Sequence, residues 1–231
     1  MRLLRFAAVA SFPLLAASAQ SGFPFTDESL RYNLTFQGGP SLGEARLTAH
    51  RSAAGWNLDA TLKAGVPGFA VADELHSAVD RGLCSQEFER GLTHAGKRTD
   101  DKTGFDQKAG SATRMTLFPA GGGKTDFGIP ACARDAVAFV YYARVELGQG
   151  RVAAPQQVFF GKAYSVSFEY IGPEEIPSGG KSVTADGIHA TVKGPKADFR
   201  CDMFFARDAA RTPLSIRIPL PAGVFSLDLV H

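Results

Sequence analysis

The chain has 231 residues, of which 45% are hydrophobic and 21% charged, so it is long enough and apolar enough to bury a core. Its 25 Lys or Arg nearly balance 23 Asp or Glu, and the basic residues form no run. A near-neutral chain without a basic segment gives no electrostatic reason to expect nucleic acid or an anionic membrane surface as a partner.

Residues 1–19 have the pattern of a secretory signal peptide rather than of a membrane anchor, because the apolar segment is short. The charged start, the apolar segment and the A-x-A cleavage site are Arg2 and Arg5, residues 6–15, and Ala17-Ser18-Ala19. We therefore predict an exported, soluble protein with one β-rich domain, residues 20–231, and no transmembrane segment. Two of the 25 basic residues leave with the signal, so the exported protein is predicted to carry no net charge.

Most of residues 30–118 alternates apolar and polar side chains, which predicts half-buried strands separated by Gly-containing turns. The clearest runs are Leu30-Tyr32-Leu34-Phe36 and Trp56-Leu58-Ala60-Leu62. After the break at Gly65-Val66-Pro67-Gly68 we expect residues 69–72 to form a short helical turn. Residues 119–123 are predicted to be a loop that leads to a helix.

Residues 130–148 are the only long segment with a convincing helical pattern. Pro130 suits the first helical position, Asp135 the positive end of the helix dipole, and Gly148 a C-terminal stop. Residues 136–143 are apolar on every side, which is typical of a buried helix, and they are too few to span a membrane. We therefore expect this helix to lie against or inside a curved sheet.

The strand pattern is strongest after the helix. The clearest runs are Tyr164-Val166-Phe168-Tyr170, Phe199-Cys201-Met203-Phe205 and Leu214-Ile216-Ile218-Leu220. Gly172-Pro173 and residues 177–180 are predicted turns. Each run has one apolar and one polar face, which suits an antiparallel sheet with one wetted face. We predict a mainly β protein: a curved antiparallel sheet or barrel-like sandwich of roughly ten to twelve strands, with one central helix at about residues 130–148.

Three cysteines remain after export, and none has the C-x-x-C spacing of a zinc or redox site. One disulfide and one buried thiol are the simplest arrangement in an oxidising compartment. We predict a disulfide between Cys84, in a turn-like segment, and Cys132, in the first turn of the expected helix. Cys201 belongs to the apolar face of its strand and is predicted to stay reduced and buried.

No motif assigns a catalytic residue, a cofactor or a metal ion. Gly121-Gly122-Gly123-Lys124-Thr125 ends like a phosphate-binding loop, but Phe118 stands where that motif needs its first glycine. The five histidines have none of the spacings that zinc sites use, and no G-x-S-x-G elbow is present. A Cys–His catalytic pair has no support from flanking residues but stays an alternative.

Two polar features stand out. Tyr141, Tyr142 and Arg144 lie on an otherwise apolar helix, and buried polar groups need partners. They either line a ligand pocket or anchor the helix to strand carbonyls, and we favour the anchoring interpretation. The second feature is a predicted structural turn between two strong strands, which contains Asp208, Arg211 and Pro213.

These two stretches resemble the signatures of a bacterial exported family, the domain of unknown function 3108. Residues 135–144, DAVAFVYYAR, resemble its D-x-x-(apolar)-x-x-Y-Y-x-R pattern. Arg207-Asp208-x-x-Arg211-Thr212-Pro213-Leu214, followed by Gly223 and an apolar strand, resembles its C-terminal pattern. The resemblance implies a periplasmic, β-rich protein of Gram-negative-type bacteria and carries no activity with it.

We therefore expect a non-catalytic binding or structural protein of the cell envelope, whose curved sheet holds a lipid or another apolar envelope molecule. One alternative is a scaffold whose sheet edge docks another envelope protein. The other is a hydrolase whose site is assembled from residues far apart in the sequence.

Overall fold

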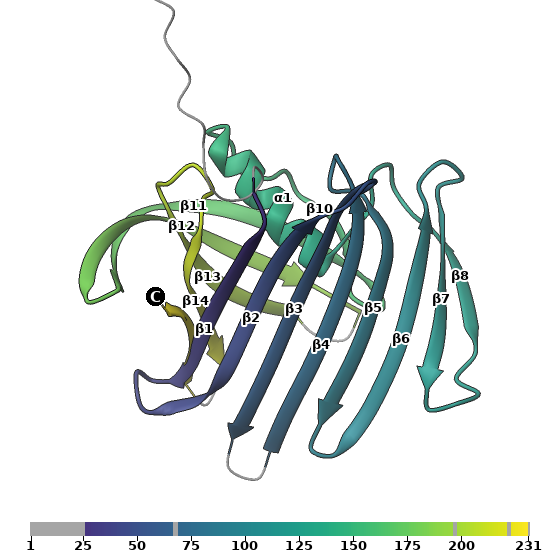
Figure 1. Cartoon of the computed structure of the whole chain (residues 1–231), viewed down its shortest axis with the longest axis horizontal. Coiled ribbons are helices and arrows are strands. Elements are labelled where there is room, and N and C mark those ends of the chain that lie inside the picture. Colours follow the sequence, from purple (N-terminus) through teal and green to yellow (C-terminus); the bar gives the residue numbers. More distant parts are fainter. Residues whose placement is uncertain (1–25, 67–68, 196–197, 221–222, 231) are drawn as a thin grey trace, which may run out of the picture.

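The computed structural model describes residues 26–66, 69–195, 198–220 and 223–230, so the predicted signal peptide lies outside the described residues. Within those ranges, a single sheet of fifteen strands curves around one α-helix (Figure 1). The elements in chain order are β1 (Glu28–Phe36), β2 (Ser41–Arg51), β3 (Gly55–Val66), β4 (Phe69–Asp80), β5 (Ser85–His94), β6 (Lys97–Asp106), β7 (Ser111–Phe118), β8 (Lys124–Gly128), β9 (Arg134–Asp135), α1 (Ala136–Gly148), β10 (Gln156–Phe159), β11 (Ala163–Ser178), β12 (Lys181–Lys193), β13 (Asp198–Ala206), β14 (Pro213–Leu220) and β15 (Gly223–Val230).

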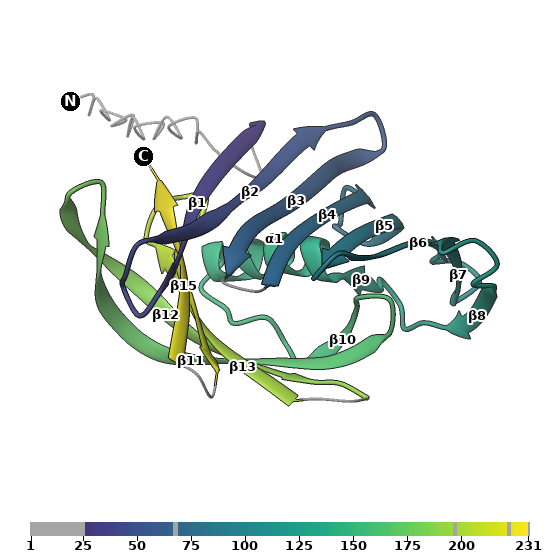
Figure 2. The ribbon, with the colours of Figure 1, turned by 90° about the horizontal axis from the view of Figure 1, so that it is seen from below.

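Strands that are neighbours in the sequence are mostly neighbours in the sheet, and these pairs are antiparallel. Two strand pairs differ. β1 pairs with β15, which is far from it in the sequence, and β9 pairs with β10 in parallel orientation. The order β8-β7-β6-β5-β4-β3-β2-β1-β15-β14-β13-β12-β11-β10-β9 leaves β8 and β9 as the two edges. Seen from below, β2–β8 and β10–β13 form two layers with α1 between them (Figure 2). The sheet is therefore strongly curved but not closed.

A mainly β protein with one helix is confirmed, but the predicted number of strands, roughly ten to twelve, is wrong. The expected helical turn at residues 69–72 is instead the start of β4, which pairs with β3 along its full length. β8 lies where the sequence predicts only the approach to a helix, and it pairs with β7. Neither segment alternates clearly, so pairing with a neighbouring strand decides its structure.

The predicted turn at Gly172-Pro173 is also wrong, because β11 continues through it. The register between β11 and β12 shifts at this point, and the hairpin turn comes later, at Gly179-Gly180. β10 pairs with β11 only as far as Val166. Among the described residues no strand pairs with that edge of β11 beyond it, and a proline on a free edge breaks no strand pairing.

The helix is shorter than predicted, because α1 begins at Ala136 and not at Pro130. Asp135 caps it: its Oδ1 accepts hydrogen bonds from the backbone N–H groups of Val137 (2.9 Å) and Ala138 (3.0 Å). The two residues before Ala136 pair with β10 as the short strand β9, and this extended pairing excludes them from the helix.

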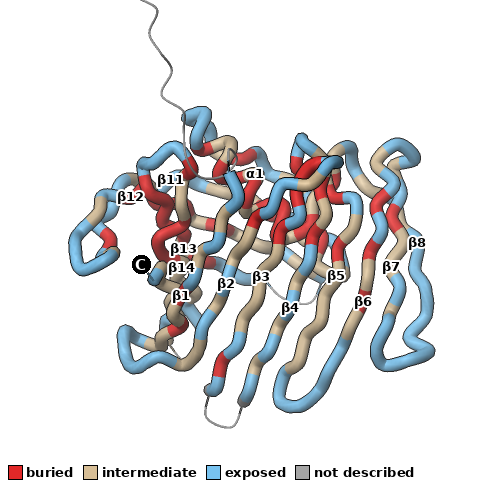
Figure 3. Tube along the Cα trace, in the orientation of Figure 1, coloured by how far each residue is buried: buried red, intermediate tan, exposed pale blue. Residues whose placement is uncertain are grey.

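Side chains on several faces of α1 are buried, in agreement with the apolar run in its sequence. Val137, Ala138 and Tyr141 pack against β3–β5, Phe139 and Ala143 against β10 and β11, and Leu147 against β12 and β13. Buried residues gather around the helix, whereas the far halves of β2–β7 are mostly intermediate or exposed (Figure 3). The core therefore lies between α1 and one end of the curved sheet.

The predicted Cys84–Cys132 disulfide is confirmed, and Cys201 is a buried free thiol, as predicted. The disulfide joins the loop between β4 and β5 to the segment before β9. It therefore fixes the chain that leads into α1 against the sheet. Within the described residues, no helix has both the length and the hydropathy needed to cross a membrane.

Candidate functional site

Arg144 is the most deeply buried cation of the described chain, with 1% of its side chain exposed. Its Nε donates to the carbonyl oxygen of Ala210 (3.0 Å), and its Nη2 donates to Oε2 of Glu28 (2.7 Å). Its guanidinium carbon lies 5.0 Å from the centre of the Tyr141 ring. One side chain thus joins α1 to β1 and to the loop between β13 and β14. These are the contacts of an anchor, and a ligand-binding role for Arg144 stays a prediction.

Two buried tyrosines accompany Arg144. Tyr141 is fully buried, and Tyr32 donates from its hydroxyl to the carbonyl oxygen of Pro213 (3.0 Å). Removal from water raises the pKa of both phenols above their usual range. Both therefore stay neutral at physiological pH, which suits packing and hydrogen bonding and does not suit proton transfer.

Tyr142 lies apart from this cluster. Its ring is half-buried, and the guanidinium carbon of Arg134 lies 3.7 Å from the ring centre. Arg134 donates from Nη1 to Oε1 of Gln156 (3.0 Å), and desolvation lowers the pKa of Arg134. Of the three predicted ligand-binding residues on the helix, Tyr141 and Arg144 therefore lie together, whereas Tyr142 contacts Arg134 and lies apart from them.

The predicted turn residues stabilise the loop between β13 and β14, whose Ala210 carbonyl accepts a hydrogen bond from Arg144. Asp208 accepts from the backbone N–H (3.0 Å) and the hydroxyl (2.7 Å) of Thr212. Arg211 donates from Nη1 to Oδ2 of Asp186 (2.8 Å), and Pro213 begins β14. Because Ala210 in the same loop bonds to Arg144, the two signature stretches of the sequence are in direct contact.

The helix cap Asp135 has a second set of partners. Its Oδ2 accepts from the hydroxyls of Ser77 (2.5 Å) and Ser85 (2.6 Å), and the side chain is fully buried. Burial raises the pKa of this carboxyl, and its four hydrogen bonds act in the opposite direction. This cluster joins the start of α1 to β4 and β5, and all three of its side chains are buried.

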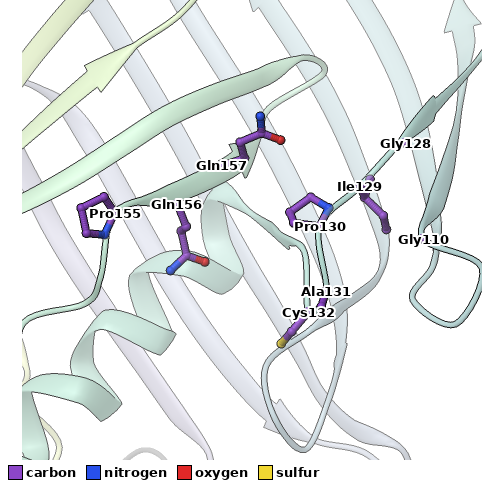
Figure 4. A pocket seen from close by; sticks show the side chains of 9 residues that line it. All are labelled: Gly110, Gly128, Ile129, Pro130, Ala131, Cys132, Pro155, Gln156 and Gln157. Atoms are coloured by element: carbon purple, nitrogen blue, oxygen red, sulfur yellow. The ribbon is translucent and has the colours of Figure 1, made fainter.

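A cleft follows the line where the sheet fails to close, between β7–β8 and β10–β11. We call it the seam cleft, with a proline end of about 540 Å³ and a lysine end of about 400 Å³. The proline end is lined by Gly110, Gly128, Ile129, Pro130, Ala131, Cys132, Pro155, Gln156 and Gln157, and Figure 4 shows Pro155 and Pro130 on its two sides. The lysine end is lined by Arg114, Thr125, Phe127, Gly128, Gln157, Phe159, Gly161, Lys162 and Ala163. Gly128 and Gln157 line both ends, so the two ends adjoin.

Side chains, rather than strand pairing, hold the two sides of the seam together. The rings of Phe127 on β8 and Phe159 on β10 are stacked, with their centres 5.6 Å apart. Arg90 donates to the carbonyl oxygen of Phe160 (3.1 Å), and Arg114 donates to that of Gly161. The result is an aromatic wall with arginines beside it.

The inner face of the sheet also carries leucines that are only half-buried. Leu30, Leu47, Ala60 and Leu75 are successive cross-strand partners on β1–β4, and Leu62 follows in the next row. We call Leu30, Leu47, Leu62 and Leu75 the inner leucines. They face the same side as the buried Leu58, since residues two apart on a strand share a face.

The sequence did not single out the aromatic and basic residues of the seam cleft. Phe127 lies in a segment without a strand pattern, and Phe159 in a run of four residues. A signal was present for Arg114: it alternates with Ala112 and Thr116 on the face that turns inward, where an arginine is unusual. The described residues contain no group of three or more His, Cys, Asp or Glu side chains arranged to hold a metal ion.

Comparisons with known proteins agree with this architecture. Among solved structures, the fold is similar to a beta-barrel-like protein of the domain of unknown function DUF1849 from Brucella abortus, with a TM-score of 0.64 over 89% of this chain and 96% of that chain. The two sequences are 9% identical, so the similarity concerns the fold alone. No curated protein matches the sequence. Residues 31–230 match the family described as "Protein of unknown function (DUF3108)", and the chain therefore belongs to that family.

Proposed function

We propose that this chain is a non-catalytic binding protein of the bacterial cell envelope that holds an apolar ligand, such as an acyl chain, in the seam cleft. The lining of the cleft carries the proposal. The stacked rings of Phe127 and Phe159 form a wall of its lysine end, and Ile129, Pro130 and Pro155 continue the apolar surface into its proline end. Both ends have volumes within the range of small-molecule sites.

The open seam leaves part of this apolar surface available to a ligand. Among the described residues, no strand pairs with the outer edge of β8, and the cleft lies along that edge. The ring of Phe127 is only partly buried, whereas Phe159 is 2% exposed and forms the buried base behind it. The apolar surface that a ligand would cover therefore comes mainly from Phe127 and from Ile129, Pro130 and Pro155. Removing such surface from water is favourable in proportion to its area, which supports an apolar occupant.

The ionisable groups of the chain support binding over catalysis. Burial raises the pKa of the Cys201 thiol to about 12, so it stays protonated and is a poor nucleophile. The other two cysteines form the disulfide and are not available for a Cys–His pair. The phenols of Tyr32 and Tyr141 also stay protonated.

Export to the periplasm is part of the proposal. The pattern of residues 1–19 is that of a signal peptide, and a disulfide between Cys84 and Cys132 persists best in an oxidising compartment.

Docking of another envelope protein is a second candidate function. Met115 and Leu117 on β7 are about half exposed, with 49% and 50% of their surface open to solvent. They lie beside the edge strand β8, and exposed apolar side chains next to an unpaired edge suit the addition of a strand from a partner.

Native mass spectrometry of protein purified from its own periplasm tests the proposal. Ala163 lies opposite Phe159 on the neighbouring strand, is exposed and lines the lysine end. The substitution Ala163→Trp should therefore fill the cleft. Glu169→Trp is the matched control, because Glu169 is also exposed on β11 and does not line the cleft.

We expect a co-purifying small molecule on the wild-type protein and on Glu169→Trp, and its loss from folded Ala163→Trp. A ligand that Ala163→Trp retains would contradict the proposed site. A wild-type protein that carries a protein partner and no small molecule would favour docking instead.

A further inference from the structure

The lysine end of the seam cleft carries positive charge that no carboxylate balances. Its ionisable lining residues are Arg114 and Lys162, and no Asp or Glu lines it. The Arg114 guanidinium donates to the carbonyl oxygen of Gly161. Within the described ranges, neither Arg114 nor Lys162 has a carboxylate within ion-pair distance, and the Lys162 ammonium has no hydrogen-bond acceptor either.

Neighbouring cations differ in this respect. Arg90 is paired with Asp101, and Lys102 lies 2.6 Å and 2.8 Å from carboxylate oxygens of Glu87 and Glu89. On β8 itself, Lys124 lies 3.5 Å from Asp126. These three cations have carboxylate partners within the chain, whereas Arg114 and Lys162 at the lysine end do not.

The two cations come from elements on opposite sides of the cleft, and the Arg114 guanidinium reaches across to the turn that carries Lys162. Arg114 belongs to β7, and Lys162 to the turn between β10 and β11. Phe127, Phe159 and Thr125 line the same end. An anion at this end meets a guanidinium and an ammonium, while an attached hydrocarbon meets the partly buried ring of Phe127, behind which Phe159 is stacked.

We propose that the lysine end of the seam cleft binds the anionic head group of an amphiphile, a carboxylate or a phosphate ester, through Arg114 and Lys162. The hydrocarbon of the same molecule lies against Phe127 and Phe159 and extends toward the proline end. This inference rests on the proposed function and adds the charge and orientation of the ligand. A neutral lipid of the same chain length gains the ring contacts but not the ionic ones.

Isothermal titration of the exported protein, freed of ligand by a hydrophobic resin, tests the inference. Laurate and dodecanol are matched probes, because they share a twelve-carbon chain and differ in charge. Lys162→Gln is the main variant, since the described structure gives its ammonium no contact to lose. Lys124→Gln is the matched control: it removes the same charge from β8, at a position adjacent to Thr125 and therefore on the opposite face of the strand.

We expect wild-type protein to bind laurate more tightly than dodecanol. Lys162→Gln should weaken laurate binding roughly 2- to 5-fold and leave dodecanol binding unchanged, and Lys124→Gln should change neither. Adding Arg114→Gln to Lys162→Gln should remove the preference for the anion. Lysophosphatidic acid with a twelve-carbon chain, measured in parallel, shows whether a phosphate or a carboxylate is preferred.

Equal affinity of the wild-type protein for laurate and dodecanol would overturn the inference but leave the proposed function intact. A preference for laurate that survives the double substitution would also overturn it. Failure of the wild-type protein to bind either probe would instead contradict the proposed function itself.

Discussion

Replacement of Arg144 by Met tests how the helix is attached to the sheet. The change keeps much of the side-chain volume and removes the charge and every hydrogen-bond donor. Glu28 and the carbonyl of Ala210 then lose their donors. The Glu28 side chain is 8% exposed, so water replaces little of what is lost.

Breaking a buried ion pair by removal of one partner costs about 3–5 kcal/mol, because the other charge stays buried without compensation. The unpaired carbonyl of Ala210 adds about 1 kcal/mol. We therefore expect Arg144→Met to lower the free energy of unfolding by about 4–6 kcal/mol, out of a total of about 5–15 kcal/mol for a typical domain. That is enough to make the protein marginally stable.

Urea denaturation followed by Trp56 fluorescence measures the change, with the midpoint and the slope fitted separately. The double variant Glu28→Gln/Arg144→Met is the informative control, because it removes the uncompensated charge together with its partner. The free energy of unfolding of this double variant should exceed that of Arg144→Met alone by about 1 kcal/mol or more. A double-mutant cycle reports that difference as a coupling energy between the two residues. An Arg144→Met protein within about 1 kcal/mol of the wild type would refute the anchoring interpretation.

Three further predictions concern the core and the disulfide. Phe139→Ala should cost about 3–5 kcal/mol in urea denaturation, because Phe139 is 4% exposed and packs against Phe168; a cost below about 1 kcal/mol would contradict this packing. Thiol titration should find one reactive thiol, Cys201, and only after unfolding, whereas reduction of the disulfide should lower stability by about 3–4 kcal/mol; three reactive thiols without reductant would contradict the pairing. Burial raises the pKa of Asp135, so the folded protein holds the proton of this carboxyl more tightly than the unfolded chain does. The resulting stabilisation is complete at a pH below the pKa of the unfolded chain, and it is lost as the pH rises through the pKa of the folded protein. Asp135→Asn should therefore gain stability relative to the wild type between pH 4 and pH 7, and a relative loss would show that the pKa is lowered instead.

Local patterns predicted much of the fold. The alternation of Trp56-Leu58-Ala60-Leu62 follows from a sheet with one buried face, and the structure places these residues on β3 facing the core or half-buried. The apolar run of α1 predicted a helix buried on several sides. The cysteine pair could be chosen because only Cys201 lay on an apolar strand face.

The errors arise where distant segments decide the structure. β4 and β8 extend because a neighbouring strand pairs with them, and α1 starts late because β9 pairs with β10. Arg144 pairs with Glu28, which is 116 residues away in the sequence. Arg114 donates a hydrogen bond to the carbonyl of Gly161, which is 47 residues away. The seam cleft forms only when β8, one edge of the sheet, approaches β10, which lies next to the other edge, β9. No local sequence pattern predicts that approach.

Photo-crosslinking with a lauric acid that carries a diazirine on its chain tests the central claim most directly, because it locates the ligand on the protein. The account predicts crosslinks to peptides that contain Phe127, Phe159 and Ala163, and their loss when unlabelled laurate competes. Crosslinks confined to the inner leucines Leu47, Leu62 and Leu75 would contradict the account, because they would place the ligand on the inner face of the sheet and not in the seam cleft.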